Sequence, residues 1–159
     1  KTMATIRYIG EAPLVAQVDT ITPGGTIESG DIFILTITGY DGTSHAVTFA
    51  ATSTTVANVA DGLTAAWNIA THALCTPITA ANETTHMTLT ADVAGVAFSV
   101  AATTTEANGE AADDQTLIRA AGTANSGPKD WSVATNWDGG AVPGAAADQD
   151  VYIEKMMLG

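Results

Sequence analysis

The segment Thr54–Thr71, TTVANVADGLTAAWNIAT, is the stretch of the chain with the clearest helical period. Its apolar residues recur every three or four positions, at Val56, Val59, Ala60, Leu63, Ala66, Trp67 and Ala70. This spacing predicts an amphipathic helix with a single apolar stripe. Thr54 or Thr55 suits the N-cap, because a hydroxyl oxygen accepts a hydrogen bond from a free backbone N–H of the first turn. Gly62 lowers helical propensity, and we expect it to allow close approach of a sheet.

Segments on both sides of the predicted helix alternate between apolar and polar or β-branched residues, which is typical of β-strands. The expected strands cover residues 5–10, 14–22, 31–39, 44–50, 78–80, 86–91, 96–101 and 116–121. Strands 31–39 and 44–50 are separated by the turn signal Asp41-Gly42 and therefore predict a β-hairpin.

Four details of this prediction depend on short stretches of sequence. Gln17 and Asp19 share one face of their strand, so we expect that face to be half exposed. Pro23-Gly24-Gly25 predicts a turn. Val96 is expected to point inward from its strand, and the polar, acidic segment 103–115 is expected to form a surface loop.

The order of these elements predicts the fold class and the domain organisation. Two strands, a helix and two strands form a ββαββ unit, so we expect a mainly β, sandwich-like fold with one packed helix (α+β). Two of the three tryptophans lie beyond residue 125, where the composition changes. We therefore predict a β-rich core domain of residues 1–124 and a C-terminal tryptophan-containing arm of residues 125–159.

Composition narrows the classes of function. The 159 residues include seventeen acidic and five basic residues, for a formal net charge of −12. Phosphate groups repel such a chain, so we expect no nucleic-acid partner. No run reaches the roughly 18 apolar residues of a membrane span, so we expect no membrane partner. The single cysteine, Cys75, excludes an intrachain disulfide and is expected to be buried near the helix end.

The sequence contains no pattern that indicates catalysis or a cofactor. His45, His72 and His86 are far apart and lack a metal-ligand spacing such as H-x-x-x-H. No G-x-S-x-G nucleophile motif is present. Asp113-Asp114 and Asp148-x-Asp150 could hold Ca²⁺, but solvated acidic loops are favoured because no EF-hand spacing is present. We expect a non-enzymatic protein with no cofactor and no metal site.

A recurring pattern covers roughly residues 30–101. Its residues are Gly30-Asp31, Leu35-Thr36-Ile37, Gly39, Phe49, Val56-Ala57, Ala65-Ala66-Trp67-Asn68, Ile78-Thr79-Ala80, Leu89-Thr90-Ala91, Gly95 and Phe98. This pattern resembles a module of phage virion proteins and of insertions in bacterial flagellar filament proteins. The resemblance implies a structural building block that carries no catalytic residues.

A second pattern, Trp131-x-x-Ala134-x-Asn136-Trp137-x-x-Gly140-x-Val142-Pro143, is followed by Asp150-x-Tyr152-Ile153. It is similar to the motif that precedes β-helical passenger or fibre regions of surface proteins. A long solenoid follows there, whereas one strand follows here, so we expect a small cap or an intersubunit arm. Trp131 and Trp137 are interpreted as a small aromatic core, as a sugar-binding platform with Asn136 and Asp138, or as a subunit contact.

Together these patterns favour a structural protein of a phage or virus particle. We expect a head decoration (cement) protein or a tail or fibre subunit, located in the virion. It would act by many weak contacts, as a homo-oligomer and with other virion proteins such as a capsid or tail protein. The alternative is a glycan-binding or adhesin module of a bacterial surface protein, located extracellularly. The candidate interface residues are Trp131, Asn136, Trp137, Val151, Tyr152, Ile153, Met156, Met157 and Leu158.

Overall fold

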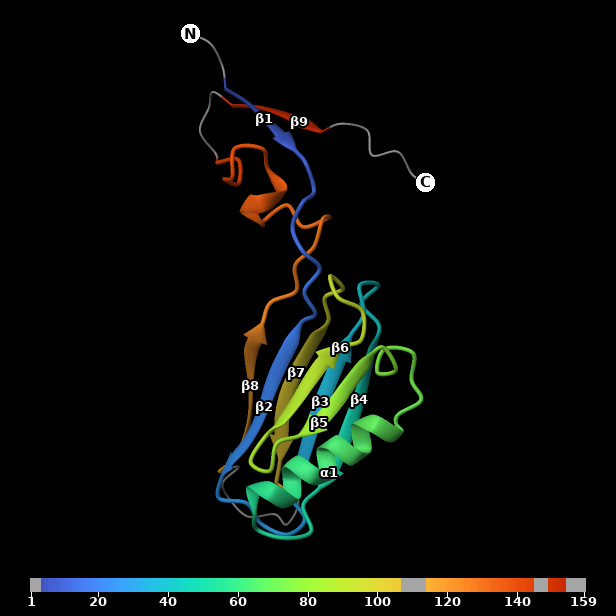
Figure 1. The fold of residues 1–159 in the computed structure, drawn as a ribbon. Helices are drawn as coiled ribbons and strands as arrows, with labels where there is room; N and C mark the ends of the chain where they lie inside the picture. Colours follow the sequence, from blue (N-terminus) through green and yellow to red (C-terminus); the bar gives the residue numbers. More distant parts are fainter. Residues whose placement is uncertain (1–3, 107–113, 145–148, 154–159) are drawn as a thin grey trace.

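A computed structural model describes residues 4–106, 114–144 and 149–153. The molecule is elongated, with a β-sandwich at one end and a small terminal unit at the other (Figure 1). One antiparallel sheet contains, in order, β5 (Ile78–Asn82), β6 (Met87–Ala91), β2 (Val18–Gly25) and β8 (Gln115–Thr123). The other contains β4 (Ser44–Ala50), β3 (Ile32–Thr38) and β7 (Ser99–Thr105). The predicted mainly β fold with one packed helix is confirmed.

The hairpin β3–β4 forms as predicted, with Phe33 opposite Phe49 and Leu35 opposite Val47. Alternate residues of β3 face the core, because side chains of a strand point to opposite faces in turn. Phe33 and Leu35 are completely buried there. The hairpin therefore supplies one wall of the hydrophobic core.

The helix α1 spans Val56–Ile69, inside the predicted segment. Thr55 is its N-cap, and the Thr55 hydroxyl oxygen accepts a hydrogen bond from the backbone N–H of Asn58. In the part of the chain that the structure describes, no helix is long and apolar enough to cross a membrane. Cys75 is buried beyond the helix end, as predicted, and burial raises the pKa of its thiol.

The apolar stripe of α1 closes one open side of the sandwich. Leu63 and Trp67 are buried, and the helix contacts β4 of one sheet and β5 of the other. The Trp67 Nε1–H donates a hydrogen bond to the Ile78 carbonyl at 2.9 Å, which ties the helix to the edge strand β5. On the opposite side of the sandwich, β7 and β8 are in contact.

The glycine of the helix lies against an aromatic ring, as its position predicted. A Cβ atom added to Gly62 would overlap carbon atoms of the Phe49 ring. Ordinary van der Waals contact needs well over 3 Å, so no residue other than glycine fits without movement of the ring. Gly62 therefore sets how closely α1 approaches β4.

Several strand boundaries differ from the prediction, and β2 begins at Val18 rather than at residue 14. The segment Pro23–Gly25 lies in β2 rather than in a turn, paired with β8 as far as Gly25. β6 pairs only with Val18–Ile21, so Pro23 lies where β2 has one partner strand, a position that tolerates a missing N–H. Strand β7 begins later than predicted and leaves Val96 exposed, whereas Thr103–Thr105 pair with β3 instead of joining the predicted loop.

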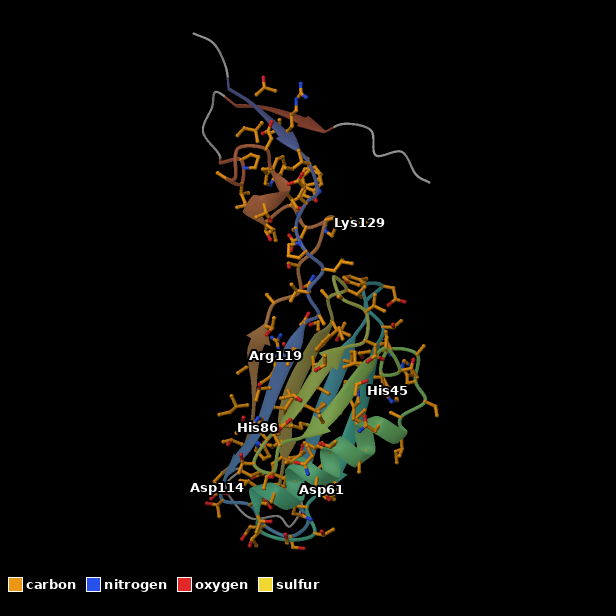
Figure 2. The ribbon with its side chains drawn as sticks, viewed as in Figure 1. His45, Asp61, His86, Asp114, Arg119 and Lys129 are labelled. Atoms are coloured by element: carbon orange, nitrogen blue, oxygen red, sulfur yellow. The ribbon has the colours of Figure 1, made fainter. Side chains whose placement is uncertain are left out.

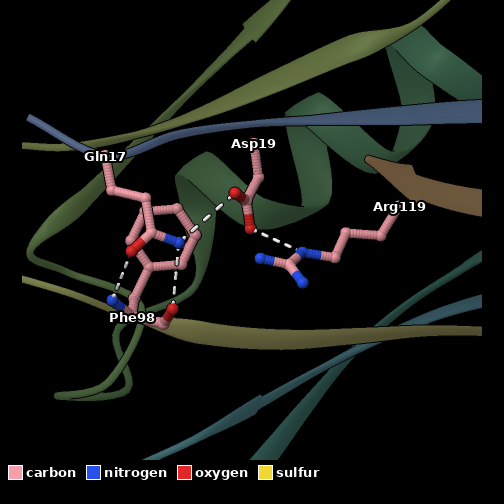
Figure 3. A network of polar contacts seen from close by, with 4 residues as sticks. All are labelled: Gln17, Asp19, Phe98 and Arg119. Atoms are coloured by element: carbon pink, nitrogen blue, oxygen red, sulfur yellow. Dashed lines mark hydrogen bonds and ion pairs between the residues drawn. The ribbon is translucent and has the colours of Figure 1, made fainter. Parts of the chain in front are cut away.

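The polar face of β2 is buried, which corrects the prediction of half exposure. Asp19 is fully buried, and its Oδ2 accepts a hydrogen bond from Arg119 Nε at 2.7 Å (Figure 3). The Gln17 side chain forms two hydrogen bonds with the Phe98 backbone, and it also donates to Asp19 Oδ1. Because these partners satisfy the polar groups, the face can point into the sandwich.

Candidate functional site

The terminal unit comprises the described residues 4–10, 129–144 and 149–153. A neck of two chain segments, residues 11–15 and 124–128, joins it to the sandwich (Figure 1). Its strands β1 (Ala4–Tyr8) and β9 (Gln149–Ile153) pair in parallel, with Ile6 opposite Val151. The prediction assigned residues 1–124 to the core, but β1 lies with the C-terminal arm instead. The reason is this long-range pairing of the two ends of the described chain.

This sheet is unusual because two parallel strands stand alone. Among the described residues, no third strand pairs with β1 or β9. Parallel sheets are normally covered on both faces, and isolated two-stranded pairs are marginal in water. The outer edge of β1 is occupied by residues 136–138, through an isolated antiparallel bridge between Tyr8 and Trp137. The outer edge of β9 therefore carries the backbone groups that can pair with an additional strand.

A cluster of three aromatic rings supports the sheet. The rings of Tyr8 and Trp137 meet edge to face, with centroids 5.0 Å apart, and Trp131 meets Trp137 in the same way at 5.9 Å. The Trp137 Nε1–H donates a hydrogen bond to the Trp131 carbonyl, and the Tyr8 hydroxyl donates to the Pro128 carbonyl. This is the small aromatic core that was one of the interpretations of the motif, with Tyr8 added from β1.

Asn136 connects the terminal unit to both segments of the neck. It lies at the end of the short 3-10 helix η1 (Ala134–Asn136) and has no exposed surface. Its Oδ1 accepts a hydrogen bond from the Ala12 N–H at 2.6 Å, and its Nδ2 donates to the carbonyls of Gly127 and Asp130 at 2.8 and 2.6 Å. An amide side chain is needed here, because it must accept and donate at the same time.

Backbone contacts extend this connection in both directions. Arg7 and Asp138 are joined twice, since the Arg7 N–H donates to Asp138 Oδ1 and the Asp138 N–H donates to the Arg7 carbonyl. Within the neck, Val15 and Ser126 form an antiparallel bridge. The neck is therefore a hydrogen-bonded pair of segments and not two independent linkers.

Two ionisable groups in this region have shifted pKa values. Burial raises the pKa of the Tyr8 hydroxyl, and the Asp130 carboxylate raises it further. The Ser132 hydroxyl and backbone N–H donate to Asp130 and hold its carboxyl pKa below the usual range. Near neutral pH, Tyr8 is therefore a hydrogen-bond donor and Asp130 an acceptor, as their contacts require.

The structure places the predicted interface residues in three groups. Trp131 is 53% exposed, and Val151 is also exposed. Asn136 and Trp137 are 0% and 3% exposed, which corrects their role: they hold the terminal unit together and cannot themselves offer contact surface. The side chains of Tyr152 and Ile153, and the whole of Met156, Met157 and Leu158, lie outside the described part of the structure.

Further apolar surface lies at the neck end of the sandwich. A cavity of about 610 Å³ opens between the two sheets there. Among the residues that line it, Tyr40, Val93 and Val96 are exposed. The Tyr40 hydroxyl donates a hydrogen bond to the Ala97 carbonyl, which joins two of the residues that line the cavity. A lining of this kind suits apolar side chains better than sugar hydroxyls.

The residues considered for metal binding do not form a site together. His45 and His72 stack with ring centroids 4.1 Å apart, a contact that their separation in sequence did not predict. In the described ranges they belong to no group of three or more ligand-type side chains. Asp114 is exposed, whereas Asp113 and Asp148 fall outside the described residues.

Sequence reasoning identified the tryptophan motif but missed its partners in the N-terminal segment. Tyr8 and Ala12 lie at least 120 residues from the groups that they contact, and neither belongs to a recognisable motif. The only sequence signal for this N-terminal segment was an alternating strand pattern that contains a tyrosine. No family model matches the sequence, and no curated protein shows significant similarity to it.

Proposed function

We propose that the chain is a non-enzymatic structural subunit of a phage or virus particle, either a head decoration protein or a tail or fibre component. It attaches through the terminal unit, while the sandwich acts as a rigid body. The central pattern of residues 30–101, which resembles a virion module, supports the phage or virus context. Binding then depends on many copies of a weak contact rather than on one tight site.

The observation that carries this proposal is the outer edge of β9 in the parallel pair β1–β9, on which no described strand lies. An exposed strand edge is a template for an added strand from another chain, and proteins that do not use such an edge usually block it. Here the pair stands away from the sandwich on a narrow neck, which leaves room for a neighbouring subunit (Figure 1). Intersubunit strand addition would provide the cover that the isolated pair lacks.

Exposed apolar side chains near the pair support the same conclusion. Ile9, Trp131, Val142 and Val151 are all exposed in the terminal unit. Aromatic and aliphatic side chains are the usual core of a protein–protein contact. The rim of the apolar cavity at the neck end of the sandwich offers a second contact surface.

The geometry of the two tryptophans favours assembly over sugar binding. A sugar platform needs exposed ring faces, because the sugar stacks on them. Trp137 is buried and lies edge to face with Trp131, so the pair offers a single exposed indole. Assembly uses this indole as an apolar contact and does not need the second one.

Sedimentation velocity over a range of protein concentrations tests the proposal. We expect the wild-type chain to form a discrete, closed oligomer such as a trimer. Val151→Asp places a charge on the exposed surface of β9 and should weaken association at least tenfold. Ile118→Asp is the matched control, because Ile118 is also aliphatic and exposed but lies on β8 of the sandwich.

Two results would contradict the proposal. A wild-type chain that stays monomeric at its highest soluble concentration would favour the binding-module alternative. Equal weakening by Val151→Asp and Ile118→Asp would place the contact away from the terminal unit.

A further inference from the structure

Three carboxylates meet at the end of the sandwich that is farthest from the terminal unit. Glu28 lies in the loop that precedes β3, Asp31 lies directly before β3, and Glu106 directly follows β7. One carboxylate oxygen from each lies within 4.8 Å of the other two. The backbone N–H of Thr26, in the same loop, donates to the Asp114 carbonyl, and Figure 2 labels Asp114 at this end of the molecule.

Asp31 is the member of this cluster that most clearly indicates a bound ligand. Its side chain is 0% exposed, and its Oδ2 accepts a hydrogen bond from the Glu28 N–H at 2.7 Å. Its Oδ1 is buried and has no hydrogen-bond partner among the residues that the structure describes. A buried carboxylate oxygen without a partner is strongly unfavourable, because it has lost its hydrogen bonds to water and has formed none with the protein.

The strand register places like charges side by side. Ile32 of β3 pairs with Thr105 of β7, so the next positions along this ladder are Asp31 and Glu106. Two carboxylates at adjacent cross-strand positions repel each other. Among the described residues, the side-chain amide of Gln115, at the start of β8, is also buried without a hydrogen-bond partner at the same end. The buried Asp31 oxygen among these carboxylates indicates a cation site rather than a solvated acidic surface.

We propose that Glu28, Asp31 and Glu106 bind one Ca²⁺ ion. The donor set contains only carboxylate oxygens, which hard cations prefer over Zn²⁺ or Cu²⁺. Ca²⁺ binds oxygens at roughly 2.3–2.6 Å, so ligands on opposite sides of the ion are up to about 5 Å apart, and the cluster fits that span. Mg²⁺ needs a tighter octahedron with ligands at roughly 2.0–2.1 Å. Asp31 Oδ1 supplies one ligand, the two glutamates supply two to four, and water completes the shell.

The ion joins parts of the fold that are far apart in the chain. Glu28 lies in the loop between β2 and β3, whereas Asp31 directly precedes β3 and Glu106 directly follows β7 of the three-stranded sheet. Bound Ca²⁺ therefore ties the β2–β3 loop to the adjacent ends of β3 and β7. It also removes the repulsion among three of the seventeen acidic residues of a strongly acidic chain.

Calorimetric titration of the EDTA-treated full chain with CaCl₂ tests this site. We expect one Ca²⁺ per chain and a higher unfolding temperature when Ca²⁺ is present, because a ligand of the folded state stabilises it. Glu28→Gln and Glu106→Gln should each weaken binding at least tenfold and abolish most of the thermal shift. Glu11→Gln is the matched control, since Glu11 is exposed in the neck, and it should bind Ca²⁺ like the wild type.

Three outcomes would overturn the assignment. One is the absence of saturable Ca²⁺ binding up to about 10 mM, above the weakest protein sites. The second is unchanged binding in both glutamine variants with folded circular-dichroism spectra, which would place the ion elsewhere. The third is binding of MgCl₂ as tight as that of CaCl₂, which would contradict the choice of ion. These variants decide the matter even if Asp31→Asn fails to fold.

Discussion

Asn136 shows how one side chain can hold a small unit in place. The terminal unit is too small to bury a large core, so it depends on directional contacts. The Asn136 amide satisfies groups in both neck segments and in its own turn, and the adjacent Trp137 fills the space beneath Tyr8. Removal of the amide leaves the Ala12 N–H and two carbonyls without these partners.

We expect Asn136→Ala to loosen the terminal unit while the sandwich stays folded. Loss of these contacts should lower the free energy of local opening by about 3 kcal/mol. That corresponds to roughly a hundredfold faster tryptic cleavage after Lys129, which lies beside the neck (Figure 2). Asn125→Ala is the control, because Asn125 makes none of these bonds. Equal cleavage rates in the two variants would contradict the role assigned to Asn136.

The role of a single residue could be predicted from the sequence only where its hydrogen-bond partner is near in the sequence. The N-cap Thr55 was predictable, because the N–H that it accepts from is three residues away. The burial of Asp19 was not, because its partner Arg119 is a hundred residues later. An alternating polar pattern indicates which residues share one face of a strand. Whether that face points to solvent or to the core depends on such distant partners.

At the scale of elements, the helix was the most predictable feature. Its stripe, its cap and its ends follow from local spacing, and they determine which side chains reach the core. The sequence correctly indicated which segments form strands. The observed strand ends differ from the predicted ones where pairing with another strand outweighed a turn signal. Pro23 remains in β2 because β8 pairs with it on one side, and no local feature of Pro-Gly-Gly reports that partner.

Gly62→Ala is expected to destabilise the protein, although alanine is the better helix former. The gain in helix propensity is about 1 kcal/mol. The added Cβ would overlap the Phe49 ring, and forced repacking of a tight core contact costs typically 1–3 kcal/mol. Urea denaturation should therefore show a net loss of about 1 kcal/mol.

The double variant Gly62→Ala with Phe49→Leu separates the two effects. A smaller side chain at position 49 makes room for the Cβ, so it should recover part of the loss. Stabilisation by Gly62→Ala alone would contradict the close approach of α1 to β4.

At the scale of the whole molecule, the sandwich and the terminal unit have different roles. The sandwich has a continuous core of large side chains, closed by α1 on one side and by β7 and β8 on the other. The terminal unit has one aromatic cluster and a pair of strands on whose β9 edge no described strand lies. Within the described residues, this edge and the proposed Ca²⁺ site lie at opposite ends of an elongated body.

This division was predictable only in part. The change in composition near residue 125 identified the C-terminal half of the terminal unit. The N-terminal half was missed because β1 joins β9 across more than 140 residues, and a parallel pairing leaves no hairpin signal in the sequence. The tryptophans of the sequence therefore identified the candidate interface, although Trp137 and the adjacent Asn136 are buried and have a structural role.

Hydrogen exchange of β1 and β9, measured against protein concentration, tests most directly whether the terminal unit is an assembly surface. Strand addition or burial by a neighbouring subunit would protect these amides only when subunits associate. We predict that exchange in residues 4–8 and 149–153 slows at least tenfold as the oligomer forms, while exchange in β3 and β6 stays constant. Exchange in β1 and β9 that does not change with concentration, in a protein that does associate, would contradict the account.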